Sequence, residues 1–138
     1  MQEDKELDIT PLLSDVNKED MNGKVIVLIF WYADCPPCTE SFGSLNSFFK
    51  QMYNPQDLII IAVTSNNEQI ASAKLKQKPL LHTLLLSNAR RISDFYQIKL
   101  YPSYIVTDKN HIIRFAVNGE SLITVPMLKS TISQVLIQ

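Results

Sequence analysis

Residues Phe30–Cys38, which read Phe-Trp-Tyr-Ala-Asp-Cys-Pro-Pro-Cys, decide the fold of this chain. They hold both of its cysteines and follow directly on its longest apolar run. That run, Val25–Trp31, is rich in β-branched and aromatic residues and is too short to cross a membrane. We therefore expect a strand that is buried on both faces.

The cysteines are predicted to lie at the start of a helix. With Cys35 as the N-cap, Pro36 takes the first helical position, where proline is favoured, and Pro37 removes only an N–H group that has no helical partner. The sulfur of Cys35 should then accept the amide of Cys38 at the positive end of the helix dipole, and both effects favour a thiolate. Cβ atoms three residues apart on a helix are about 5–6 Å apart, so a small rotation reaches disulfide geometry. The pair is therefore predicted to cycle between dithiol and disulfide.

Composition limits the classes of protein to which this chain can belong. With 138 residues, 46% of them hydrophobic, and a net charge of -1, it is predicted to form a single domain with a substantial core. The near-neutral charge, without a basic stripe, argues against a nucleic-acid partner. Residues 1–8 are acidic and no apolar segment follows them, so they do not resemble a signal peptide and are expected to form a flexible tail. A disulfide between these cysteines would close a loop too short to restrain the unfolded chain much, so a purely structural role is disfavoured.

The pattern of apolar residues predicts alternating helices and strands. A short helix is expected within residues 10–22, ending by Gly23. The strand after it, a helix from the cysteines to about Tyr53 and a second apolar strand form a βαβ unit with parallel strands. Further elements are predicted at 67–76 (a weak helix), 83–86 (a short strand), 89–98 (a helix with Ile92, Phe95 and Tyr96 on one face), 103–107 and 112–117 (an antiparallel hairpin) and 126–137 (a closing helix that includes Met127).

Three features together resemble thioredoxin-fold proteins: Phe30-Trp31, the Cys35–Cys38 motif, and Tyr101-Pro102 ahead of a strand-turn-strand. The resemblance covers about residues 20–138 and implies an α/β fold with a central mixed β-sheet flanked by helices. The segment before the 89–98 helix is longer than in a minimal thioredoxin and resembles the TlpA/ResA group of envelope thiol-disulfide oxidoreductases. Tryparedoxin and nucleoredoxin, which also carry Cys-Pro-Pro-Cys, are the nearest rivals.

The resemblance implies roles for particular residues. Cys35 would be the attacking thiol and Cys38 the resolving thiol, and only these two roles also follow from the residues themselves. Trp31, Tyr101 and Pro102 would contact substrate. Pro102 would be a cis-proline, although the residues alone favour trans, the usual state of an X-Pro bond.

The resemblance also implies partners and a compartment. The substrates would be disulfides in proteins, no cofactor would be needed, and a membrane-borne reductant would restore the dithiol of a monomeric enzyme. The location would be the bacterial cell envelope or periplasm, although this sequence shows no leader; the cytoplasm is the alternative for a tryparedoxin-like or nucleoredoxin-like reductase.

The chain departs from the family pattern around the cysteines. Ile29 stands where thioredoxin has a buried aspartate, and Ser41 and Gly43 stand where TlpA-type proteins often carry glutamate and proline. Asp34, directly before Cys35, is therefore predicted to tune the thiol pKa, because a neighbouring carboxylate disfavours a second negative charge. That effect favours a reductant. Glu40 is expected to point away from both sulfurs.

Other uses of the cysteines fit the sequence less well. A zinc site needs four ligands, and the only other candidates, His82 and His111, stand at unrelated spacings and are expected at the surface. A copper-delivering relative would need Cys-x-x-x-Cys, and a peroxiredoxin a single attacking cysteine with threonine and proline before it. The remaining alternative is a protein-binding module whose redox pair is vestigial, which insulin reduction would distinguish from an oxidoreductase.

Overall fold

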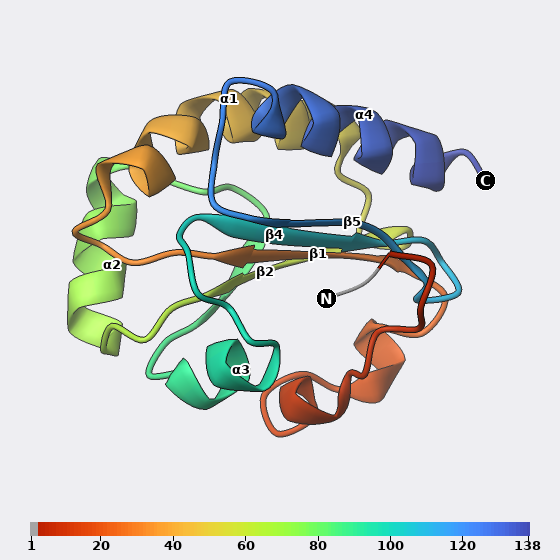
Figure 1. Ribbon diagram of the computed structural model, residues 1–138, viewed down its shortest axis with the longest axis horizontal. Helices are drawn as coiled ribbons and strands as arrows, with labels where there is room; N and C mark the ends of the chain where they lie inside the picture. The colour runs from red at the N-terminus through yellow and green to blue at the C-terminus, as the bar shows by residue number, and fades with distance from the viewer. Residues whose placement is uncertain (1–2) are drawn as a thin grey trace.

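The computed structural model describes residues 3–138 and contains a five-stranded sheet in the order β3-β2-β1-β4-β5 (Figure 1). The strands are β1 (Val25–Phe30), β2 (Leu58–Val63), β3 (Thr83–Leu86), β4 (Ser103–Thr107) and β5 (Ile113–Asn118). β1, β2 and β3 are parallel, whereas β4 runs antiparallel to both β1 and β5. The mixed sheet, the βαβ unit and the hairpin confirm the predicted α/β fold.

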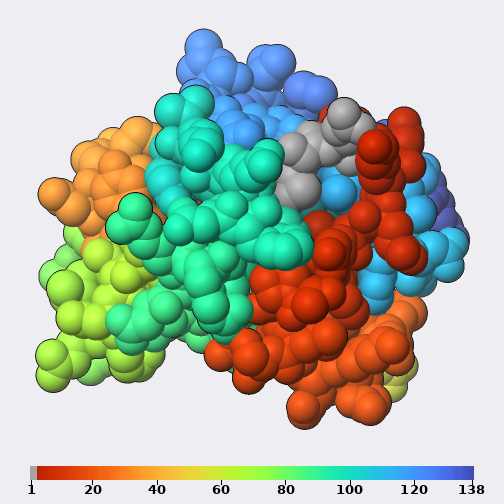
Figure 2. Space-filling model, turned by 60° about the horizontal axis from the view of Figure 1, so that its bottom comes forward, coloured from red at the N-terminus to blue at the C-terminus, as the bar shows by residue number. Residues whose placement is uncertain are grey.

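Helices cover both faces of this sheet. α1 (Pro36–Met52) and α4 (Thr124–Leu136) lie side by side on one face, and α3 (Arg90–Phe95) lies on the other with the two 3-10 turns η1 (Thr10–Leu12) and η2 (Lys18–Asp20) (Figure 1). α2 (Glu68–Gln77) joins β2 to β3 and buries Ala71 in the core shared with α1. Figure 2 shows the N-terminal segment against α3, where Arg91 pairs with Asp15 at 2.7 Å.

The central strand β1 explains why its sequence is apolar throughout. All of its residues are fully buried, and alternate side chains enter two different cores. Val25, Val27 and Ile29 pack under α1 and α4, whereas Ile26, Leu28 and Phe30 pack under α3 and the N-terminal segment. A strand with helices on both faces has no solvated side, so no polar alternation survives in its sequence.

The N-terminal segment differs from its prediction. Residues 10–22 form two 3-10 turns rather than one helix, because a helix this short is marginal in water and burial of Leu12, Val16 and Met21 decides the path instead. Part of the predicted tail pairs with the hairpin: Glu6 bridges Ile112, and Leu7 is buried. The first two residues of that predicted tail lie outside the described residues.

Two predicted core residues are exposed. Phe95 is 51% exposed because the buried face of α3 and its C-cap carries Ile92, Ser93 and Tyr96 instead. Met127 is also 51% exposed, since α4 begins at Thr124 rather than Pro126 and presents Leu128, Ile132 and Val135 to the core. Pro126 thus lies inside the first turn, where its missing N–H group costs no helical hydrogen bond.

Candidate active site

Both cysteines lie at the N-terminal end of α1 and form a disulfide, with their Cα atoms 5.3 Å apart. Cys35 is the N-cap, in an extended conformation, and its sulfur accepts the Cys38 N–H at 3.3 Å. This geometry confirms the capping arrangement predicted from the two prolines. Cys35 is 2% exposed and Cys38 is fully buried, so the sulfur pair lies just below the surface.

The aromatic residues before the motif divide between core and surface. Trp31, predicted to contact substrate, is fully buried, and its ring packs edge-on against Phe42 at 5.5 Å between centroids. The correction has a simple cause: the Trp31 amide donates to the Val63 carbonyl at 3.1 Å, which continues the strand pairing and keeps the indole inside. Tyr32 points the opposite way and is 38% exposed. Side chains alternate between the two sides of an extended chain, and this alternation could have identified Tyr32 as the exposed aromatic residue.

Tyr101 and Pro102 lie in the loop that leads into β4, next to Tyr32. The Tyr101-Pro102 peptide bond is cis, which confirms what the family resemblance implies. Pro102 is buried and its carbonyl accepts the Gly119 N–H at 3.0 Å, whereas Tyr101 is half-buried and its ring meets that of Tyr32 edge-on at 5.4 Å. Within residues 3–138, neither main-chain group of Tyr101 has a hydrogen-bond partner.

A small cavity opens beside this tyrosine. It has a volume of about 550 Å³ and its walls come from the loop after β2, from α3 and from the segment after α3. Its lining residues are Ser65, Arg90, Asp94, Ile98, Lys99 and Tyr101. The charged side chains at its mouth are exposed, so the cavity is a shallow opening in the surface near the cis-proline loop.

A polar network, which sequence reasoning missed, links the buried hydroxyls of Ser41 and Tyr104 beneath α1 to the exposed residue Glu120. Tyr104 pairs with Ile29 across β4 and β1, and its hydroxyl lies 3.1 Å from Ser41 Oγ and 3.4 Å from a Glu120 carboxyl oxygen. Ser41 also donates to the Cys38 carbonyl at 2.8 Å. The Tyr104 hydroxyl donates to the Glu120 carboxylate and the Ser41 hydroxyl donates to the Cys38 carbonyl, while the two hydroxyl oxygens lie within hydrogen-bond distance of each other.

Burial and neighbouring groups shift the acid-base behaviour of this network. Burial raises the pKa of the Glu120 carboxyl, the hydrogen bond from Tyr104 lowers it, and the nearby negative charge of Glu40 raises it. Burial also raises the pKa of the Tyr104 hydroxyl, so this group stays protonated. The sequence singled out Ser41 only as a departure from the family pattern and did not link it to Tyr104, because the two are 63 positions apart and hydroxyl residues are common.

The acidic residues near the motif lie outside this network or at its edge. Asp34 is exposed on the turn between β1 and α1, directly before the N-cap. Glu40 lies close enough to act on Glu120, on the side of α1 that faces the loop before α4. The tuning of the thiol by Asp34 stays a prediction.

The two histidines contact different parts of the chain. His82 is exposed, as expected, and stacks on Tyr53 with the ring centroids 4.4 Å apart. His111, expected at the surface, is half-buried, because its Nε2–H group donates to the Met21 carbonyl at 2.7 Å. Within residues 3–138, no three His, Cys, Asp or Glu side chains gather in a group that would hold a metal.

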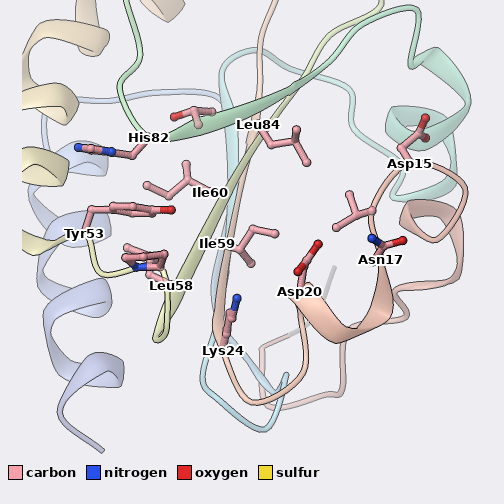
Figure 3. Close-up of a pocket in the computed structure, with 13 residues that line it drawn as sticks. Asp15, Asn17, Asp20, Lys24, Tyr53, Leu58, Ile59, Ile60, His82 and Leu84 are labelled. Atoms are coloured by element: carbon pink, nitrogen blue, oxygen red, sulfur yellow. The ribbon is translucent and has the colours of Figure 1, made fainter.

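Another cavity, of about 610 Å³, lies at the other end of α1 (Figure 3). Tyr53 at the end of α1 and His82 form one wall, and Ile59 and Leu84 form the floor. Asp20 and Lys24 extend into it from the N-terminal segment. Since α1 has 17 residues and a helix rises about 1.5 Å per residue, this cavity is roughly a helix length from the cysteines.

The chain belongs to the Redoxin family, whose model matches residues 1–132. It is similar to the thiol-disulfide oxidoreductase ResA of Bacillus cereus, with 24% identity over 106 residues that cover 76% of this chain and 61% of that protein. ResA of Geobacillus kaustophilus is 23% identical over 101 residues, covering 72% of this chain and 58% of that protein. The chain thus spans less than two thirds of the length of these relatives.

Solved structures show the same fold. The thioredoxin domain of a thiol-disulfide oxidoreductase from Bacteroides vulgatus matches with a TM-score of 0.70 and 19% identity, covering 88% of this chain and 85% of that one. StoA from Bacillus subtilis matches with a TM-score of 0.64 and 21% identity, covering 79% and 82%. These similarities confirm the resemblance to the TlpA/ResA group. Among the helices within residues 3–138, none has the length and apolar character needed to span a bilayer.

Proposed function

We propose that this protein is a thiol-disulfide oxidoreductase that reduces disulfides in protein substrates through the Cys35–Cys38 dithiol. The observation that carries the proposal is the Cys35 sulfur at the N-cap of α1, where it accepts the Cys38 amide. A thiolate at this position gains a hydrogen bond and a favourable helix dipole, and the thiolate is the nucleophilic form. The similarity to ResA supports the same reaction class.

The reaction is a two-electron exchange in two steps. The Cys35 thiolate attacks one sulfur of the substrate disulfide, which forms a mixed disulfide and releases the other substrate sulfur as a thiolate. Cys38, deprotonated, then attacks the Cys35 sulfur, closes the Cys35–Cys38 disulfide and releases the second substrate sulfur. The substrate takes up two electrons and the protein loses two. Cys35 acts first because its sulfur is the N-cap and accepts the Cys38 amide, which stabilises its thiolate.

An extended substrate would lie across the cis-proline loop. The free main-chain groups of Tyr101 would pair with it as an added strand, with Tyr32 and the Tyr101 ring on either side. Pro102 would support this loop from below, since it is buried. Regeneration needs a separate reductant, and by analogy with the TlpA/ResA group we place it in a bacterial membrane and the domain in the envelope.

Substrate trapping tests the proposal. Reduced protein should reduce insulin stoichiometrically, and a Cys38→Ser variant should collect mixed disulfides on Cys35 that dithiothreitol releases. A Cys35→Ser variant is the matched control, because it keeps the other thiol and the same fold. If reduced protein leaves insulin intact and Cys38→Ser forms no mixed disulfide with any protein, the pair is vestigial and the domain is a binding module.

A further inference from the structure

Asn66 joins three loops at the end of the sheet where the cysteines lie. It follows β2 and is half-buried between the β1–α1, β2–α2 and β3–α3 loops. Because β1, β2 and β3 are parallel, these loops leave the sheet at the same edge. Asn66 therefore has access to the segment that carries Cys35.

The side chain of Asn66 makes a short hydrogen bond to that segment. The Ala33 N–H donates to Asn66 Oδ1 at 2.7 Å, and the Thr64 hydroxyl donates to the same oxygen at 3.2 Å. Both partners are donors, so the oxygen of the carboxamide must face them. The Asn66 N–H in turn donates to the Thr64 hydroxyl at 3.3 Å, which fixes the side chain relative to its own backbone.

We call the hydrogen-bonded group of Ala33, Thr64 and Asn66 the Asn66 clasp. The main chain of Thr64 and Asn66 is also held from a second side. The Asn88 N–H donates to the Asn66 carbonyl at 2.8 Å, and the Ala89 N–H donates to the Thr64 carbonyl at 2.9 Å. Both donors belong to the loop between β3 and α3. Asn66 Oδ1, which accepts the Ala33 amide, therefore belongs to a segment that follows β2 and is hydrogen-bonded to the loop after β3, so it does not lie on a free loop.

We infer that Asn66 is a positioning residue for the attacking thiol, an inference that rests on the proposed function. The turn before the N-cap Cys35 begins after Trp31, whose amide donates to the Val63 carbonyl. Within this turn, the hydrogen bond from the Ala33 amide to Asn66 Oδ1 is the main-chain anchor. The Cys35 sulfur meets the Cys38 amide only if this turn delivers the extended N-cap conformation. Asn66 therefore favours the thiolate at Cys35 without touching the sulfur.

The neighbouring asparagine offers a matched control. Asn67 is the N-cap of α2, and its Oδ1 accepts the Ile70 N–H at 2.9 Å. Replacing either asparagine by alanine removes one side-chain acceptor from adjacent positions. Only Asn66 reaches the cysteine loop, so a general loss of stability should affect both variants and a positioning effect only one.

The experiment compares Asn66→Ala and Asn67→Ala in a Cys38→Ser background, where Cys35 is the only thiol. The readouts are the rate of Cys35 alkylation by iodoacetamide as a function of pH and the hydrogen exchange of the Ala33 amide. Since one hydrogen bond is worth about a factor of five in the population of the bonded state, Asn66→Ala should slow alkylation at pH 7 by about fivefold. It should also raise the Cys35 pKa and speed Ala33 exchange, whereas Asn67→Ala should change neither alkylation nor Ala33 exchange by more than about twofold.

The result can overturn the inference in two ways. Faster Ala33 exchange with unchanged alkylation would show that the clasp does not position the thiol, and equal effects of both variants would show a merely structural role. If Asn66→Ala does not fold, Thr64→Val replaces it, because the loss of this hydroxyl should slow alkylation in the same direction, and an unchanged rate refutes the inference. If Cys35 is unreactive even when Asn66 and Asn67 are both present, the proposed function is wrong. The exchange rates of the Ala33 amide would still show in that case whether Asn66 holds the turn.

Discussion

The two ends of α1 differ in how they are organised. At the N-terminal end, the sulfurs lie just below the surface, and side chains that accept main-chain amides hold the surrounding loops. At the C-terminal end, the stacked rings of Tyr53 and His82 form a wall of a cavity of about 610 Å³, together with charged side chains. Both cavities are open to solvent, and their volumes, about 610 Å³ at Tyr53 and about 550 Å³ beside Tyr101, do not distinguish the two ends. The disulfide and the unpaired main-chain groups of Tyr101, with which an extended chain could pair, do distinguish them.

The largest expected effect is at the cysteine end. Cys35→Ser should lower the rate of insulin reduction to background, because we expect the N-cap thiol to be the one that attacks substrate. Cys38→Ser should still form mixed disulfides but should not release them, because it lacks the resolving thiol. Stopped-flow reduction of insulin and mass spectrometry of the trapped species measure the two outcomes. The assignment is wrong if Cys38 in Cys35→Ser is alkylated faster than Cys35 in Cys38→Ser.

The next effect separates the buried from the exposed aromatic residue at this end. Trp31→Ala should lower the free energy of unfolding by about 3–5 kcal/mol, the usual cost of deleting a buried ring from a core, as measured by urea denaturation. Tyr32→Ala should change it by less than about 1 kcal/mol but raise the KM for a peptide disulfide. A Trp31→Ala protein with unchanged stability would contradict the burial of this ring.

A smaller effect concerns the network beneath α1. Since the pKa of Glu120 is raised in the folded protein, folding favours its protonated form, and stability is lost as the pH rises above the ordinary glutamate value of about 4.3. Glu120→Gln keeps a neutral acceptor for the Tyr104 hydroxyl and should be more stable than wild type at pH 7. The difference should stay below about 1 kcal/mol because the carboxyl is partly solvated. Thermal unfolding at pH 4 and pH 7 measures it, and a gap that widens toward pH 4 would refute this account.

Asp34 should have a modest effect on the redox potential. Asp34→Asn removes a negative charge next to Cys35, so it should lower the thiol pKa and raise the potential, by less than the roughly 30 mV that corresponds to a tenfold change in the exchange equilibrium. The wild-type potential should lie nearer to that of thioredoxin, about −270 mV, than to that of DsbA, about −120 mV. Equilibration with glutathione and alkylation against pH give both values. Glu40→Gln is the control and should change neither, and a higher pKa in Asp34→Asn would contradict the electrostatic role.

The smallest effect on activity should come from the other end of α1. His82→Ala removes the stack on Tyr53 and should cost about 1 kcal/mol of stability, in the range for an aromatic pair. Its insulin reduction should remain within about twofold of wild type, because nothing at this end reaches the sulfurs. An activity loss as large as that of Cys38→Ser would show that the two ends are coupled.

Sequence alone predicted what local chemistry determines. The strand at Val25, the helix that begins after Cys35 and the capping of Cys38 follow from apolar pattern and from the special backbone of proline. The clasp at Asn66 and the network at Tyr104 did not follow, because each joins residues that are distant in sequence through polar side chains with no periodic pattern. One signal was available for the clasp: the pair of asparagines directly after an apolar strand supplies one more acceptor than the following helix needs for its N-cap.

The pairing of the N-terminal segment with the hairpin has a consequence for how the protein handles extended chains. The Ile113 amide donates to the Lys5 carbonyl at 2.8 Å, and the Asp4 amide donates to the Ile113 carbonyl at 2.7 Å, so this border of the sheet offers few free groups near Ile113. The opposite border, β3, is four residues long. Free strand borders attract other chains and promote aggregation. With both borders limited in this way, the unpaired main-chain groups of Tyr101, whose ring contacts Tyr32 three residues before Cys35, are left as the place where an extended chain could pair without competing attachment elsewhere.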